Sequence, residues 1–417
     1  MNIEEWKHLP LEDCMEAIID YRGKTPRKSS FGIPLITAKI VKGGRILEPT
    51  EFIPFEDYDE RMQRGIPKSG DVVITTEGPL GEVGQLDDRK LSIGQRLIAL
   101  RGKKGLLDNT YLKFLLMSDY VQNQLLARQT GTTVSGIKQA ELRKIDLLIP
   151  PITIQHRIAE ILSALDDKIE LNRQVNATLE ATVQAIFKEW FVDFNFPSMT
   201  GKLIESELGM IPEEWRVGKL GEVCELIKGV SYSSDELQPS NKALVTLKSI
   251  NRQGGFNSSG FKEYNGKYKS SQCLIEGDLI FAQTDITQNA DVIGSPAIVE
   301  NPFDYEKLIA SLDIVKCKPT NEMPSSRTLY YFLQRKEFKD YCLSQTNGST
   351  VLHLRSSEIP NYSMIIPCRR MLIKFDSLAT TFTQNIFDNN RQNRILSELR
   401  DTLLPKLMCG EINLWNG

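Results

Sequence analysis

The sequence predicts an α+β fold in which two related domains are each followed by one long helix. The first observation is an internal repeat within the 417 residues: LPLEDCMEAI near the start is similar to GKLGEVCELI, and KSGDVVITTEG to IEGDLIFAQTD. The second is that residues 152–196 and 368–404 contain no glycine or proline. Uninterrupted stretches of this length favour long helices.

The repeat extends through each predicted domain. In both copies a Gly-Asp turn leads into an alternating apolar segment, which is typical of a strand. QTGTTVSGIKQAEL then matches QTNGSTVLHLRSSEI, and LLIPP matches MIIP. The offset is 217 residues for each of the pairs Gly131/Gly348, Pro150/Pro367 and Ile169/Ile386. Each half is therefore expected to be a mixed, strand-rich domain closed by its own helix.

The two predicted helices carry a coiled-coil seam. A 3-4-3-4 spacing is mostly apolar in both copies, which favours helix pairing over an ordinary surface helix. Pro405 falls inside the second seam and is expected to kink or end that helix. The first seam has Ile158, Leu162, Leu165, Ile169, Asn172, Asn176, Leu179, Val183, Ile186 and Trp190, and the second has Phe375, Ala379, Phe382, Ile386, Asn389, Asn393, Leu396, Arg400, Leu403 and Leu407.

Two asparagines occupy the middle of each seam. If the helices pair antiparallel, Asn172 meets Asn393 and Asn176 meets Asn389. Buried asparagine pairs lower stability but penalise shifted registers, so these residues are expected to fix one axial alignment. The alternative is that the seam is hydrated there and asparagine is merely tolerated.

Charge and motifs argue against several classes of protein. The net charge of −3 argues against a protein that coats nucleic acid non-specifically, since such domains are usually strongly basic. No stretch matches a phosphate-binding P-loop, and His8, His156 and His353 do not lie at metal-ligand spacing. We expect no catalytic or metal site. The polar N-terminus, the lack of a long apolar run and the unpaired cysteines predict a cytoplasmic protein without a membrane span.

Four segments in order carry a family resemblance: LLIPPITIQHRIAEILSALDDKIELNRQ, AIFKEWFVDFNFP, GMIPEEWRVGKLGEVCELIKG and LLPKLMCGEI. Together they resemble the specificity (S) subunit of type I restriction–modification systems. The resemblance implies target recognition domains at residues 1–150 and 213–367. It further implies spacer helices at 151–194 and 368–417 and a linker at 195–212. The two domains are then related by a pseudo-twofold axis, and the long helices form an antiparallel coiled coil.

The resemblance also implies a function and partners. Such a subunit is not an enzyme by itself; each domain reads one half of an asymmetric, bipartite double-stranded DNA target. Two methyltransferase (M) subunits dock on the helices, and restriction (R) subunits complete the nuclease. This chain is expected to bind no cofactor, whereas the methyltransferase uses S-adenosylmethionine. The alternatives are a standalone DNA-modifying enzyme and a coiled-coil scaffold without a DNA role.

Three loops carry groups suited to DNA. Lysine and arginine suit phosphates and base edges, and hydroxyls suit phosphate oxygens. The alternative for each loop is a solvated surface turn. The candidate residues are Arg22, Lys24, Arg27 and Lys28 in YRGKTPRKSS; Thr132, Thr133, Ser135 and Lys138 in GTTVSGIKQ; and Ser349, Thr350, His353 and Arg355 in NGSTVLHLRSS.

The aromatic residues Trp190, Phe191 and Phe194 end the first predicted helix. Packing against the linker or the other helix is the expected role, and a docking face for a methyltransferase subunit is the alternative.

Overall fold

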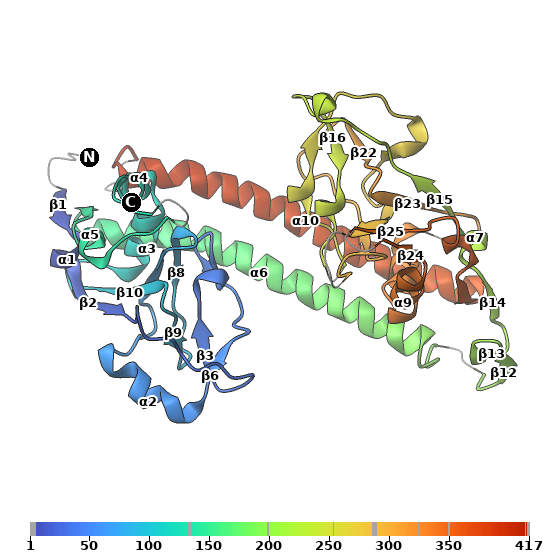
Figure 1. Cartoon of the computed structure of the whole chain (residues 1–417), viewed down its shortest axis with the longest axis horizontal. Helices are drawn as coiled ribbons and strands as arrows, with labels where there is room; N and C mark the ends of the chain where they lie inside the picture. Colours follow the sequence, from blue (N-terminus) through green and yellow to red (C-terminus); the bar gives the residue numbers. More distant parts are fainter. Residues whose placement is uncertain are drawn as a thin grey trace. The chain divides into compact units, whose positions relative to one another are not determined.

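The computed structural model describes residues 6–131, 135–197, 200–252, 254–285, 290–323, 325–348, 351–412 and 414. The chain divides into two compact units (Figure 1). Unit 1 comprises Met1–Glu170 and Ile395–Gly417, and unit 2 comprises Leu171–Arg394. Each unit therefore holds one of the two predicted domains together with part of both long helices.

Unit 1 is rich in short strands and short helices. Its strands are β1 (Lys7–Pro10), β2 (Met15–Asp20), β3 (Ile33–Ile36), β4 (Val41–Lys42), β5 (Arg45–Ile46), β6 (Phe52–Ile53), β7 (Val72–Thr76), β8 (Leu80–Gln85), β9 (Ser92–Ile93), β10 (Leu97–Gly102) and β11 (Asp146–Ile149). Its short helices are α1 (Leu11–Cys14), η2 (Ala38–Ile40), η3 (Phe55–Asp57), α2 (Tyr58–Arg61), η4 (Met62–Arg64), α3 (Asn109–Met117), α4 (Asp119–Ala127) and α5 (Gln139–Leu142).

A four-stranded antiparallel sheet in the order β2-β10-β7-β8 forms the centre of unit 1. Successive side chains of a strand point to opposite faces. Val72 and Ile74 accordingly join the apolar cluster that includes α3, whereas Val73 joins the cluster that includes β3 and β9. Because both faces of β7 are covered, all five of its residues are buried.

The start and end of the first domain pair with each other. Strand β1 runs antiparallel to β11, with Lys7 opposite Ile149. Helix α6 (Ile152–Phe191) begins directly after Pro150 and Pro151. The buried Gln155 side chain donates to the carbonyl oxygens of Leu106 and Pro150, at 2.9 and 2.8 Å. These bonds hold the start of the helix on the domain.

Unit 2, like unit 1, is rich in short strands and short helices. Its strands are β12 (Leu203–Ser206), β13 (Gly209–Pro212), β14 (Arg216–Lys219), β15 (Cys224–Lys228), β16 (Lys242–Val245), β17 (Lys262–Glu263), β18 (Cys273–Leu274), β19 (Leu279–Ala282), β20 (Thr284–Asp285), β21 (Pro296–Ile298), β22 (Lys307–Ala310), β23 (Ile314–Pro319), β24 (Thr346–Asn347), β25 (Leu352–Leu354) and β26 (Ser363–Ile366). Its short helices are α7 (Leu220–Val223), η5 (Ser234–Glu236), η6 (Leu247–Ser249), η7 (Ser258–Gly260), η8 (Ser270–Gln272), α8 (Ser326–Leu333), α9 (Lys336–Ser344) and η9 (Ile359–Asn361).

The internal repeat of the sequence is a repeat of structure. The order β15-β23-β19-β21 in unit 2 corresponds to β2-β10-β7-β8 in unit 1, and β14–β26 corresponds to β1–β11. The Gly-Asp turn also recurs with its ion pair. Asp71 pairs with Arg101 at 2.7 Å, and Asp278 pairs with Lys316 at 2.7 Å. A shared frame therefore underlies two domains of different sequence.

The long helices α6 and α10 (Arg369–Met408) pack against each other (Figure 1). Every predicted seam position is buried or half-buried. The asparagine contacts described below run in opposite chain directions, so the helices are antiparallel. Pro405 does not end α10, which continues to Met408. Within unit 1, buried Leu404, Leu407 and Met408 pack in the core of the first domain, which stabilises this last turn.

The segment predicted as a linker contains a hairpin, β12–β13, with Ser206 opposite Gly209. The turn is two residues long, and Gly209 has φ +96°, which favours glycine. Residues 203–212 give little periodic signal because each strand has four residues and most of them are exposed. Phe191, at the end of α6, packs against Trp215 and Phe375 at centroid distances of 5.7 and 5.2 Å. The expected packing role of the aromatic cluster is confirmed.

Candidate nucleic-acid interface

One end of the unit 1 sheet gathers loops from distant parts of the chain. Strand β2 ends where β10 begins, since Asp20 lies opposite Ile98, and β7 ends beside them with Thr75 opposite Leu97. The parallel strands β3 and β9 also end together, and the Gly94 amide donates to the Ile36 carbonyl at 2.7 Å. We call the residues that follow these strand ends, together with residues 135–138, the first loop cluster. It comprises residues 21–28, 37–39, 77–79, 94–96 and 135–138.

Residues 135–138 join this cluster through backbone and side-chain bonds. The Ile137 amide donates to the Thr76 carbonyl at 2.9 Å, and Gly136 forms a bridge with Glu77. Arg22 donates to the Ile137 carbonyl at 3.0 Å. The predicted loops around Arg22 and Ser135 are therefore brought together, although they are more than a hundred residues apart. Thr132 and Thr133 lie outside the described residues.

The predicted cations of the first loop cluster differ in their surroundings. Arg22 is bound to Asp20 at 2.7 Å as well as to Ile137, so it positions the two loops. Arg27 pairs with Glu56 and Asp57, and Lys28 pairs with Glu51, all at 2.7–2.8 Å. The side chains of Arg27 and Lys28 are 61% and 54% exposed. Ion pairs of exposed cations are of low energy, so a phosphate can replace the carboxylate partner. Lys24 is half-buried, whereas Ser135 and Lys138 are exposed.

Hydrogen bonds from the buried Arg61 side chain hold the backbone of residues 22–28. Arg61, which is 8% exposed, donates to the carbonyl oxygens of Lys24 and Ile93 at 3.0 and 2.7 Å. Its Nε donates to the Ser92 hydroxyl at 2.9 Å. Burial lowers the pKa of this guanidinium, but an arginine remains charged at neutral pH. Arg61 therefore fixes the cationic loop against the end of β9.

The structure adds three polar residues that the sequence analysis did not select. A cavity of about 320 Å³ in the first loop cluster is lined by Thr25, Lys28, Lys39, Gln95 and Arg96 among others. Gln95 Nε2 donates to the Thr25 hydroxyl at 2.5 Å, and Arg96 pairs with Glu77 at 3.1 Å. Lys39, Gln95 and Arg96 lie two or three residues beyond the ends of the short strands β3 and β9. A rule that polar residues after strand ends meet at one sheet edge would have selected them.

Unit 2 presents an equivalent set of loops. Ala282, at the end of β19, lies opposite Ile314, at the start of β23, and β20 pairs with β25 through Thr284 and His353. We call residues 229–233, 246–248, 283–285, 311–313 and 352–356 the second loop cluster. His353 and Arg355 are exposed within it. Ser349 and Thr350 lie outside the described residues.

The four seam asparagines are hydrogen-bonded across the helix pair within unit 2. Asn172 Nδ2 donates to Asn393 Oδ1 at 2.9 Å, and Asn389 Nδ2 donates to Asn176 Oδ1 at 2.8 Å. Asn172 is 2% exposed, so its amide is satisfied inside the seam. The pairs are those expected for antiparallel helices. Their role in setting the register stays a prediction.

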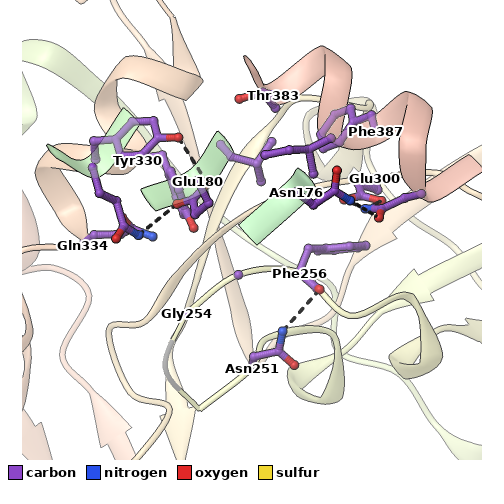
Figure 2. Close-up of a pocket in the computed structure, with 16 residues that line it drawn as sticks. Asn176, Glu180, Asn251, Gly254, Phe256, Glu300, Tyr330, Gln334, Thr383 and Phe387 are labelled. Carbon is purple, nitrogen blue, oxygen red and sulfur yellow. Dashed lines mark hydrogen bonds between the residues drawn. The ribbon is translucent and has the colours of Figure 1, made fainter. Parts of the chain in front are cut away.

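A cavity of about 440 Å³ with polar and apolar side chains in its wall lies beside Asn176 in unit 2 (Figure 2). Asn176 donates to Asn390, and Asn390 donates to both oxygens of Glu300 at 2.9 and 3.1 Å. Burial raises the pKa of Glu300 to about 7, the nearby Glu276 adds to the shift, and the bond from Asn390 opposes it. Burial also raises the pKa of Glu180, which accepts bonds from Gln184 and Tyr331. Residues of the helix seam and residues of the second domain therefore line the same cavity.

Among the described residues, no cluster of three or more histidine, cysteine or acidic side chains has the arrangement of a metal site. In the same part of the chain, no helix combines the length and apolar character that crossing a membrane requires.

The fold and the two loop clusters define a duplicated protein that carries two unlike polar surfaces on one helical frame. Residues 3–181 and 212–369 match the family described as the type I restriction modification DNA specificity domain. The chain therefore belongs to the specificity subunits of type I restriction–modification systems. It is a DNA specificity subunit with two target recognition domains, the non-catalytic part of a complex that binds DNA.

Individual relatives agree with this assignment. The chain is 27% identical to the type I restriction enzyme MjaIX specificity subunit of Methanocaldococcus jannaschii, over 99% of this chain and 94% of the relative. It is 27% identical to the HindI specificity subunit of Haemophilus influenzae, over 72% and 77% of the two chains. The crystal structure of the S subunit from M. genitalium has the same fold, with a TM-score of 0.54, 17% identity and 96% coverage of both chains.

Proposed function

We propose that each target recognition domain reads one half of an asymmetric, bipartite DNA target. The observation that carries the proposal is the repeat of one frame with different side chains in its loop clusters. A protein with two related readers binds two half-sites, and unlike contacts require unlike half-sites. The proposed domain boundaries are those inferred from the sequence, 1–150 and 213–367.

The proposed role also implies which proteins this chain binds. Two methyltransferase subunits dock on α6 and α10 and use S-adenosylmethionine, and restriction subunits join the complex for cleavage. The chain itself holds no cofactor. Because the substrate is chromosomal DNA, the complex works in the cytoplasm. The candidate phosphate and base contacts are the exposed cations of the two loop clusters, including Lys28, Lys138 and Arg355.

A methylation map tests the central proposal. Genomic DNA is compared between cells with and without this chain, both retaining the methyltransferase subunit. We expect adenine methylation to disappear at one split motif with two unlike halves and a fixed gap. Methylation that persists without the chain, or a single undivided motif, would contradict the proposal. A standalone enzyme would instead transfer methyl groups in the absence of the methyltransferase subunit.

We also propose that the helix pair acts as a spacer ruler. A helix of 40 residues is about 60 Å long, more than one DNA turn of about 34 Å. Inserting four residues near Asn176 adds about 6 Å and is expected to lengthen the unread gap by one to two base pairs. The control is an insertion of equal length at Gly105, an open turn with φ +78°. A gap that stays constant in the helix variant would rule out the ruler.

A further inference from the structure

The two loop clusters can be compared position by position because equivalent backbone hydrogen bonds recur in them. The Gly94 amide donates to the Ile36 carbonyl at 2.7 Å, as the Ser311 amide donates to the Val245 carbonyl at 3.0 Å. These two bonds make Gly94 equivalent to Ser311 and Ile36 equivalent to Val245.

Two more bonds extend the comparison. The Thr76 amide donates to the Arg96 carbonyl at 2.9 Å, as the Gln283 amide donates to the Asp313 carbonyl at 2.8 Å. The Ile137 amide donates to the Thr76 carbonyl, as the Leu354 amide donates to the Gln283 carbonyl, both at 2.9 Å. The equivalences therefore do not depend on sequence similarity.

Some equivalent positions carry the same charge in both clusters. Lys39 in η2 corresponds to Lys248 in η6, since Thr37-Ala38-Lys39 and Thr246-Leu247-Lys248 each follow the equivalent strand. Lys138 corresponds to Arg355, directly after Ile137 and Leu354. All four cations are exposed. A phosphate contact carries no sequence information, so both readers can retain it although their half-sites differ.

Other equivalent positions carry unlike side chains. After the strands β9 and β22, unit 1 has Gln95 and Arg96, whereas unit 2 has Leu312 and Asp313. Arg96 and Leu312 are 57% and 43% exposed. The same corner of the frame therefore presents amide and guanidinium groups in one reader, and an exposed apolar side chain beside a half-buried carboxylate in the other. Contacts to base edges must differ between readers of different half-sites.

The side chains at this corner suit defined bases. Gln95 gives one amide hydrogen to Thr25, which leaves a second hydrogen and the carbonyl oxygen for the donor and acceptor of an adenine edge. Arg96 is tied to Glu77 through Nε, which leaves its terminal nitrogens for guanine. An exposed leucine such as Leu312 suits the methyl group of thymine.

We propose that this corner, Gln95 with Arg96 in unit 1 and Leu312 in unit 2, determines base specificity, and that the matched pairs Lys39/Lys248 and Lys138/Arg355 bind phosphates. The inference rests on the proposed function, since it assumes that each unit reads one half-site. It assigns sequence recognition to residues at the ends of short strands and affinity to residues that both readers share.

Methylation maps of complexes that contain Q95A, R96A or L312Q test the assignment. Q95A and R96A are expected to relax one base position in one half of the motif and to leave the other half unchanged. L312Q is expected to change the other half only. An unchanged motif in all three variants, or a change in both halves from one variant, would overturn the proposal. A wild-type complex that methylates no split motif would instead refute the proposed function.

K39A and K248A are the matched controls. Each is expected to weaken DNA binding by the complex at every sequence, to lower the slope of log K against log salt concentration by about 1, and to leave the motif unchanged. A changed motif in K39A would overturn the division between phosphate and base contacts.

If Q95A abolishes methylation altogether, no motif can be read from its map. Gln95→Glu then tests the assignment of Gln95. The Thr25 hydroxyl can donate to the new carboxylate, so the local structure is preserved. A carboxylate accepts from cytosine N4 and lacks the amide hydrogens that adenine requires. We expect the preferred base at that one position to change. Unchanged preference would overturn the assignment of Gln95.

Discussion

Asn389 donates a hydrogen bond to Asn176 across the antiparallel helices, with Nδ2 and Oδ1 2.8 Å apart. Asn176 in turn donates to Asn390, which donates to Glu300 of the second domain. The middle of the helix seam in unit 2 is therefore a polar chain that ends on a carboxylate. An apolar seam can pack at many registers, whereas sliding these helices is expected to leave amides unpaired, which is the predicted role of the asparagines.

Asn176 and Asn389 are expected to be energetically coupled. Each single alanine substitution leaves a partner amide unsatisfied, whereas the double substitution removes both groups. We expect a coupling energy of about 1 kcal/mol in a double-mutant cycle measured by denaturant unfolding of the full chain. The control cycle pairs Asn176→Ala with Lys144→Ala, a residue of unit 1. Additive effects in the Asn176/Asn389 cycle would contradict the interaction.

Glu300 is expected to make stability depend on pH. Burial raises its pKa to about 7 in the folded chain, above its ordinary value of 4.5. The folded state therefore binds this proton more tightly than the unfolded state. Its contribution is fully present below about pH 4.5 and is lost as pH rises towards 7, by about 1.4 kcal/mol per pKa unit.

The variant E300Q removes this titration and can still accept from Asn390. The unfolding temperatures of the wild type and E300Q are measured at pH 5.5 and pH 8. The increase in unfolding temperature from wild type to E300Q is expected to be larger at pH 8. E189Q, at an exposed site on α6, is the control. Equal differences at both pH values would show that Glu300 does not titrate in this range.

Asp166 is expected to be important for the stability of unit 1. It accepts from Lys113 at 2.6 Å and from Arg400 at 2.9 Å, and all three side chains are nearly buried. Asp166→Ala leaves two cations without this partner, and breaking such a pair costs about 3–5 kcal/mol. The exposed pair Lys144–Glu141 is the control, where Glu141→Ala is expected to change the free energy of unfolding much less than Asp166→Ala does. Similar losses in both variants, measured by denaturant unfolding, would contradict the prediction.

Arg61 is expected to control the order of residues 22–28. Arg61→Ala leaves the carbonyl oxygens of Lys24 and Ile93 without this donor, at about 1–3 kcal/mol for each buried group. Trypsin cleaves after lysine and arginine, so cleavage within 22–28 should become faster in the folded variant. The exposed Arg89→Ala is the control. Cleavage at the wild-type rate would show that Arg61 does not hold the loop.

The sequence by itself determined the repeat, the long helices and the seam asparagines, because each of these leaves a local or periodic pattern. Strand β7 shows the limit. The sequence analysis predicted an alternating apolar segment there, whereas the structure buries all five residues of the strand. The run VVITT therefore does not show that Val73 belongs to one cluster and Val72 to another. The hairpin β12–β13 was likewise missed because short exposed strands carry little pattern.

Only the tertiary structure decided which loops meet. Arg22 and Ile137 come together because β2 and β7 end at the same sheet edge, and no local signal encodes that distance along the chain. The same holds for Gln95 and Arg96, whose place in the first loop cluster depends on the parallel pairing of β3 and β9. Local residue preferences specify helices and turns, whereas strand pairing between distant segments is selected by burial of the whole core. The recognition surface is a product of that pairing.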